Sequence, residues 1–143
     1  MVTDIAVMKK IIVSVFLCLL VGVVHATPAT VGYVIDGDTF AATVNLEDGI
    51  KISVRVRILD IDTPELSSDC PAEVVIAERA RDRLRELLPD GVVVDLRDIK
   101  DDKYLGRIDA RVFMGDGRNV SDIMLQENLA RRYNGGKRTP WCK

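Results

Sequence analysis

The chain lacks several features that would point to particular classes of protein. Its 143 residues contain one histidine, and 20 basic residues are nearly balanced by 22 acidic ones, for a net charge of −2. This balance argues against a protein that coats nucleic acid by bulk charge, although it leaves room for a local basic site. Low-complexity runs and repeats are absent, which argues against a disordered chain and a solenoid. The length fits one domain with one core.

Residues 1–26 have the pattern of a secretory signal peptide. Lys9 and Lys10 precede an apolar run over residues 11–24, which ends in the small-x-small sequence Val24-His25-Ala26. The run is shorter than the roughly 20 residues of a membrane-spanning helix. We therefore expect cleavage after Ala26, a secreted or periplasmic product that is not attached to a membrane, and a mature domain over residues 27–143.

Cleavage would also restrict the chemistry that the mature domain can perform. It removes His25, the single histidine, and Cys18, one of three cysteines. Histidine bases, Ser-His-Asp and Cys-His triads and histidine-bound zinc are then excluded, and carboxylates, arginines, hydroxyls, lysines or a hard metal ion remain. The remaining cysteines, Cys70 and Cys142, are expected to form a disulfide in an oxidising compartment.

Apolar periodicity and turn residues predict a small barrel with two helices. Strands are expected over residues 31–35, 40–46, 50–58, 92–96 and 108–114, and helices over residues 71–88 and 120–128. The order βββαββα indicates an α+β or mostly β fold, a five-stranded Greek-key barrel of the OB type with two packed helices. A split α+β sheet is the alternative for the same pattern.

Two acidic loops offer oxygen ligands. Asp36-Gly37-Asp38-Thr39 joins the first two expected strands, and Ile61-Asp62-Thr63-Pro64-Glu65 follows the third. Either loop alone is compatible with an ordinary turn. In adjacent loops of a small barrel, however, Asp38 and Asp62 would provide hard oxygen ligands suited to Ca²⁺, and the backbone carbonyl of Thr63 would complete the site.

Two arginines are the other candidates for the site. Arg57 lies near the end of the third expected strand, and Arg107 closes the segment Asp102-Lys103-Tyr104-Leu105-Gly106-Arg107. Either one alone would be read as a solvated charge at the end of a strand. A guanidinium can bind two phosphate oxygens and remains charged throughout a reaction, so two of them beside a metal suit phosphodiester chemistry.

Taken together, these motifs resemble the staphylococcal nuclease family. The resemblance extends over residues 31–133, through the motifs at residues 34–39, 57–65, 102–107 and 129–130. The resemblance implies that Asp38, Asp62 and the Thr63 carbonyl bind Ca²⁺, that Arg57 and Arg107 clamp phosphate, and that Glu65 activates water. It also implies that Lys103, Tyr104 and Tyr133 bind substrate.

The activity implied by the resemblance is calcium-dependent hydrolysis of DNA and RNA with little sequence preference, leaving 3′-phosphate products. We expect nucleic acid as substrate, no stable protein partner and a monomer. A noncatalytic OB-fold module that binds nucleic acid or protein is the alternative, although such modules typically lack the acidic ligands and arginines. A calcium-stabilised structural protein would leave Arg57 and Arg107 without a task.

Two departures from the family pattern affect the site. Leu105 is an additional residue before Gly106-Arg107, so the loop must bulge to bring Arg107 to the phosphate. Where the family continues into a further helix, this chain has a short, glycine-containing basic tail from about residue 134. We expect the Cys70–Cys142 disulfide to tie this tail to the loop after Glu65.

Overall fold

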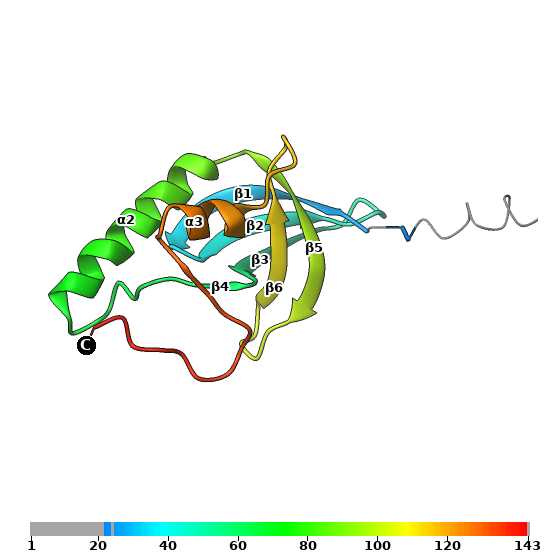
Figure 1. Cartoon of the computed structure of the whole chain (residues 1–143). Helices are drawn as coiled ribbons and strands as arrows, with labels where there is room; N and C mark the ends of the chain where they lie inside the picture. The colour runs from blue at the N-terminus through cyan, green and yellow to red at the C-terminus, as the bar shows by residue number, and fades with distance from the viewer. Residues whose placement is uncertain (1–21, 24, 143) are drawn as a thin grey trace, which may run out of the picture.

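A computed structural model describes residues 22–23 and 25–142, in which five strands close into a barrel (Figure 1). The barrel strands are β1 (Thr27–Asp36), β2 (Thr39–Asn45), β3 (Lys51–Ile58), β5 (Val93–Asp101) and β6 (Arg107–Phe113). Their order is β1-β2-β3-β6-β5; β3 and β6 run parallel, whereas the other neighbours are antiparallel. This mixed closed barrel confirms the predicted OB-type fold.

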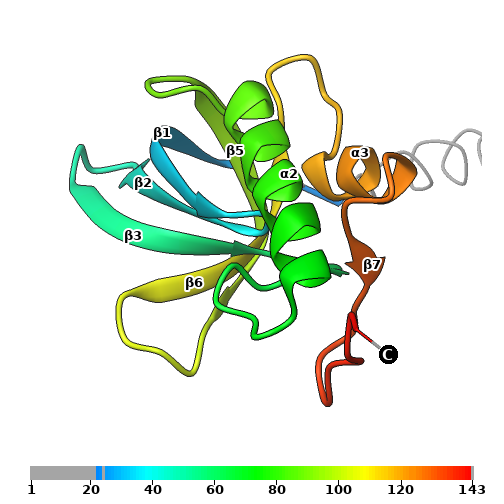
Figure 2. The same cartoon turned by 90° about the vertical axis from the view of Figure 1, so that its left-hand side faces the viewer.

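The core fills the barrel and continues beneath two helices. Phe40, Val56 and Leu96 are fully buried, each on a strand whose residues alternate between the inside and the outside of the barrel. Helix α2 (Pro71–Leu87) packs against β1, and helix α3 (Val120–Gln126) packs against β6. Figure 2 shows α2 lying across the barrel with α3 beside it.

Parts of three elements, β3, α2 and β5, differ from what the sequence pattern indicates. Strict alternation places Ile50, Ile52, Val56 and Ile58 on one face of the third strand, but Ile50 and Ile52 are 53% and 43% exposed, whereas Val56 and Ile58 are buried. Ile52 pairs with Val44 near the tip of the β2–β3 hairpin, so only the second half of β3 reaches the core. Ala72, expected on the inner face of α2, is exposed in its first turn. Strand β5 runs to Asp101, five residues beyond its predicted end.

A small second sheet, which the sequence did not predict, brings the tail to the acidic loop. Strands β4 (Ile61–Asp62) and β7 (Arg131–Arg132) pair antiparallel, and the Tyr133 amide donates to the Asp60 carbonyl at 3.0 Å. The predicted Cys70–Cys142 disulfide is present, with the two Cα atoms 6.5 Å apart. Figure 1 shows the tail returning to the loop before α2. The Asp62 loop is therefore fixed between the barrel, α2 and the tail.

Most of the expected signal peptide lies outside the described residues, so its cleavage stays a prediction. Over residues 22–23 and 25–142, we find no helix with the length and apolar character required to cross a membrane.

Candidate active site

A close approach of three backbone segments builds the floor of the site. Gly37 lies in the turn between β1 and β2, and a Cβ atom there would lie 2.8 Å from the Ala80 Cβ and 2.9 Å from the Thr63 Oγ1. Such distances are shorter than real Cβ contacts, so glycine allows the turn to pack directly on α2 and on the Thr63 loop. Gly37 thereby joins the two acidic loops that the sequence placed on separate turns.

Asp38 is buried at this junction, with 5% of its surface exposed. One of its carboxylate oxygens accepts the Thr63 amide at 3.2 Å and lies 3.2 Å from Arg57 Nη1, while the other accepts the Thr39 hydroxyl at 3.1 Å. A buried carboxylate requires such partners. The structure therefore brings Asp38, Thr63 and Arg57 together.

Asp62 and Glu65 face the C-terminal tail. The guanidinium of Arg138 donates to Asp62 Oδ1, to Glu65 Oε1 and, at 3.3 Å, to the Thr63 carbonyl. The other oxygen of Asp62 accepts the Trp141 indole N–H at 3.3 Å. Asp62 is 4% exposed, whereas the Glu65 side chain is 44% exposed. Three predicted functional residues thus converge on one cationic group of the chain itself.

The two predicted phosphate clamps are held from different directions. Arg57 Nη1 donates to the carbonyls of Ile58 and Ile61, at 2.9 and 3.1 Å, and so fixes the loop that carries Asp62. Arg107 Nε donates to Asp102 at 2.6 Å, and the Arg107 Cζ lies 4.4 Å from the centre of the Tyr104 ring. Because β3 and β6 are parallel neighbours, both arginines reach the same side of the barrel.

An open cleft of about 710 Å³ collects most of the predicted site. Its walls include the following predicted residues: Asp38, Arg57, Glu65, Lys103, Tyr104, Arg107 and Tyr133. Asp62 instead lines an adjoining hollow of about 410 Å³, and Glu65 and Arg138 line both. Thr63 lies beneath, 2% exposed. The chain turns at Leu105 and Gly106, and Arg107 lines the cleft; Leu105 itself is fully exposed.

The acidic side of the cleft carries excess negative charge. Burial, together with the neighbouring charges of Asp38 and Glu65, raises the pKa of Asp36 to about 6. On the opposite side, burial also raises the pKa of Asp109, together with its hydrogen bond to Asp102. Carboxylates that raise one another's pKa repel each other when ionised, and a nearby cation would stabilise their charged forms.

The oxygen donors of this region fit a hard divalent cation. In the part of the chain that the structure describes, no three histidine, cysteine, aspartate or glutamate side chains are grouped to hold a metal ion. The predicted set comprises two carboxylates, Asp38 and Asp62, and the Thr63 carbonyl. Arg138 contacts both Asp62 and that carbonyl, so these oxygens are already aimed at one positive charge. Oxygen donors of this kind suit Ca²⁺.

Sequence reasoning missed Arg138, Trp141 and the role of Asp102. Asp102 stood in a quoted motif, and its spacing from Arg107 was a usable signal for an ion pair within one loop. The expected disulfide already tied the tail to the Glu65 loop, so a basic residue four positions before Cys142 was also a usable signal. Which of the tail's basic residues would reach Glu65 depends on backbone geometry that the sequence does not reveal.

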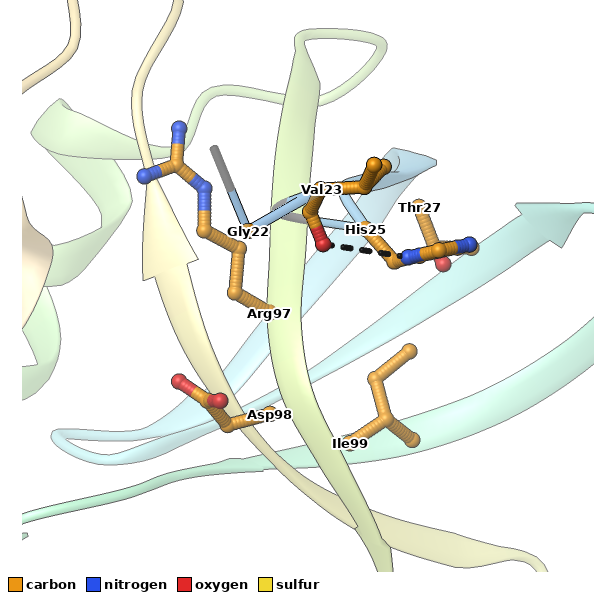
Figure 3. Close-up of a pocket in the computed structure, with 7 residues that line it drawn as sticks. All are labelled: Gly22, Val23, His25, Thr27, Arg97, Asp98 and Ile99. Atoms are coloured by element: carbon orange, nitrogen blue, oxygen red, sulfur yellow. Dashed lines mark hydrogen bonds between the residues drawn. The ribbon is translucent and has the colours of Figure 1, made fainter. Parts of the chain in front are cut away.

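Figure 3 shows another hollow, of about 590 Å³, between the start of the described chain and β5. It is lined by Gly22, Val23, His25, Thr27, Arg97, Asp98 and Ile99, and His25 Nδ1 lies 3.3 Å from the Val23 carbonyl oxygen. Cleavage after Ala26 would remove three of its walls. None of the predicted site residues lines this hollow, whereas most of them line the cleft around Glu65, which is therefore the candidate site.

Comparison with known families matches residues 55–140 to the model described as "Staphylococcal nuclease homologue". The match covers more than half of the chain and includes Arg57, Asp62, Glu65 and Arg107. The Asp38 loop precedes it. Among curated proteins, no match to the chain was found.

Proposed function

The chain belongs to the staphylococcal nuclease family, and from that premise we propose that it is a calcium-dependent nuclease that hydrolyses DNA and RNA with little sequence preference. The observation that carries the proposal is the convergence of Arg57, Arg107 and Glu65 on one cleft beside buried carboxylates. Two permanent positive charges opposite a carboxylate match a phosphodiester and the water that attacks it.

Arg57 and Arg107 would bind the phosphate and stabilise the charge that grows on its oxygens in the transition state. Both guanidinium groups are already oriented by the protein, Arg57 by backbone carbonyls and Asp38, and Arg107 by Asp102 and the Tyr104 ring. Donors held in place before the reaction need not reorganise during it, which makes their electrostatic effect large. Lys103, Tyr104 and Tyr133 would hold the flanking nucleotides along the same cleft.

Glu65 would accept the proton of the attacking water and hold it at a carboxylate oxygen. Its side chain is 44% exposed, so water reaches it, and its backbone amide is fixed by a hydrogen bond of 3.0 Å to Glu73. Attack in line with the bond to the 5′ oxygen would break that bond and leave the phosphate on the 3′ side, while the departing 5′ oxygen would take a proton from water in the open cleft. A general base of this kind contributes about 10²–10⁴-fold to the rate.

Asp38, Asp62 and the Thr63 carbonyl would hold Ca²⁺. When bound, the cation would supply positive charge that draws electrons from the phosphate. Two observations support this assignment. Asp38 and Asp62 are buried carboxylates, and the pKa of the neighbouring Asp36 is raised. A noncatalytic binding module has no use for a solvent-accessible Glu65 between these acids and two oriented arginines.

We further propose that the protein acts as a monomer outside the cytoplasm, after cleavage near Ala26. The Cys70–Cys142 disulfide supports an oxidising compartment, since such bonds persist there. The substrate would then be free nucleic acid in that compartment.

Glu65→Gln tests the proposed base. We expect turnover of supercoiled plasmid to fall about 10²–10⁴-fold, because glutamine cannot accept a proton from water. Circular dichroism should stay unchanged, because Glu65 lies at the surface. Glu78→Gln makes the same change at an exposed position of α2 and should nick plasmid at the wild-type rate. Wild-type turnover in Glu65→Gln would refute the role of Glu65.

A further inference from the structure

The C-terminal tail places a cation of the protein on the oxygens that are predicted to bind a metal. Arg138 donates through Nη1 to Glu65 and through Nη2 to Asp62 and the Thr63 carbonyl. Building on the proposed function, we propose that Arg138 is an internal competitor of the divalent cation, and that the tail is an autoinhibitory strap which lowers the affinity of the site for Ca²⁺.

The contacts leave little of Asp62 for another ligand. Arg138 binds one carboxylate oxygen, and the Trp141 indole N–H binds the other at 3.3 Å. Asp62 is 4% exposed, so its oxygens cannot turn toward solvent while the tail is in place. A cation that coordinates Asp62 must therefore displace Arg138, Trp141 or both.

The positive charge of the Arg138 guanidinium also balances the negative charges of the carboxylates in the site. A guanidinium keeps its charge throughout the pH range in which proteins are normally studied, so Arg138 is not released by losing its own proton. Its two-pronged donor geometry suits a pair of carboxylates, here Asp62 and Glu65. With Arg138 bound, the base Glu65 is also engaged in an ion pair and is less free to accept a proton.

Several contacts hold the tail in position around Arg138. Tyr133 donates its hydroxyl to the Gly136 carbonyl at 2.6 Å, which closes the glycine turn before Arg138. Beyond it, Arg131 stacks on Trp141 at 3.7 Å and donates to the Pro140 carbonyl at 3.0 Å. The Cys70–Cys142 disulfide fixes the end of the tail to the loop before α2.

This anchoring makes the competition intramolecular. A tethered group binds its site with a high effective concentration, up to the millimolar range or above for short links. The apparent affinity for Ca²⁺ equals the affinity of the open form multiplied by the fraction of molecules in which the strap is open. Opening the disulfide would loosen the strap, so the redox state of Cys70 and Cys142 would set how strongly the site binds the metal.

Isothermal titration of the oxidised protein with calcium chloride, without nucleic acid, tests the proposal. We expect Arg138→Gln to bind Ca²⁺ at least about tenfold more tightly than the wild type, because the variant has lost the competing charge. Lys137→Gln, one residue away in the tail, removes the same charge from an exposed side chain and should leave the affinity unchanged. Cys142→Ser should lie between the wild type and Arg138→Gln.

The single tryptophan gives a second measurement. Since Trp141 donates to Asp62, binding of Ca²⁺ to the wild type should change its fluorescence in step with the calorimetric titration. Equal Ca²⁺ affinity in the wild type and Arg138→Gln would overturn the strap while leaving the calcium site intact. A gain of equal size in Lys137→Gln would also overturn it, because the effect would then be net charge. Failure of every variant to bind Ca²⁺ would overturn the calcium site itself, and the strap with it.

Discussion

The guanidinium of Arg107 is held in the cleft by two neighbours from its own loop. Asp102 accepts its Nε–H at 2.6 Å, and the Tyr104 ring lies against its face. Burial tends to raise the pKa of Asp102, but hydrogen bonds from Arg107 and from the Tyr104 amide outweigh it and lower the pKa to about 2. The ion pair fixes Arg107 although the loop contains the additional Leu105. Asp102 thus links the stability of the fold to the geometry of the phosphate clamp.

Asp102→Asn should therefore lower the free energy of unfolding by about 2 kcal/mol at neutral pH, since each unit of pKa shift corresponds to about 1.4 kcal/mol. The folded-state pKa lies below the ordinary value, so the stabilisation is present above pH 4 and is lost as the pH falls from about 4 to 2. Urea unfolding across this range measures it. Asp90→Asn, in the exposed turn after α2, serves as the control. A difference between Asp102→Asn and wild type that stayed constant down to pH 2 would contradict the assigned ion pair.

The first turn of α2 positions the loop that carries Glu65. Glu73 accepts the Glu65 amide at 3.0 Å and the Ser68 hydroxyl at 2.5 Å, and Ser68 in turn accepts the Cys70 amide at 3.1 Å. The hydrogen bond from Ser68, followed by that from the Glu65 amide, lowers the pKa of Glu73. One helix terminus therefore fixes both the proposed base and the loop to which the tail is bonded.

Glu73→Ala should reduce kcat for plasmid cleavage about tenfold and leave KM nearly unchanged, because the loop loses its anchor while the phosphate clamps stay in place. Glu73→Gln retains one carbonyl acceptor and should recover part of the loss. Glu78→Gln on the same helix is again the control. If KM rose and kcat did not change, Glu73 would act on binding and not through Glu65.

At the scale of the whole molecule, the sequence predicted what depends on periodicity and on strong motifs. The barrel followed from alternating strands, and α2 followed from Pro71 and its apolar spacing. The candidate site residues came from acids and arginines in named loops, and most of them line one cleft. The pairing of β4 with β7 could not be predicted, because two residues in each strand carry no periodic signal. The burial of Ile52 could not be inferred from its pattern. The tip of the β2–β3 hairpin extends beyond the barrel, so its residues keep the apolar alternation but have no core beneath them.

The contact of Arg138 with Asp62 shows the same limit at a longer range. The residues lie far apart in the sequence, and the contact depends jointly on the β4–β7 pair, the glycine turn after Tyr133 and the disulfide. Each of these three features is local, but only together do they place the Arg138 guanidinium in the site. Charge alone singles out none of the tail's basic residues.

The proposed activity is hydrolysis of nucleic acid in the cleft with the help of calcium. Release of acid-soluble nucleotides from denatured DNA by the purified, oxidised protein measures this activity, with calcium chloride in one series and a chelator in excess in the other. We expect release to rise with calcium and to stop when the chelator is added, both in the wild type and in Arg138→Gln. Equal release with and without calcium, or no release from either protein at saturating calcium, would contradict it.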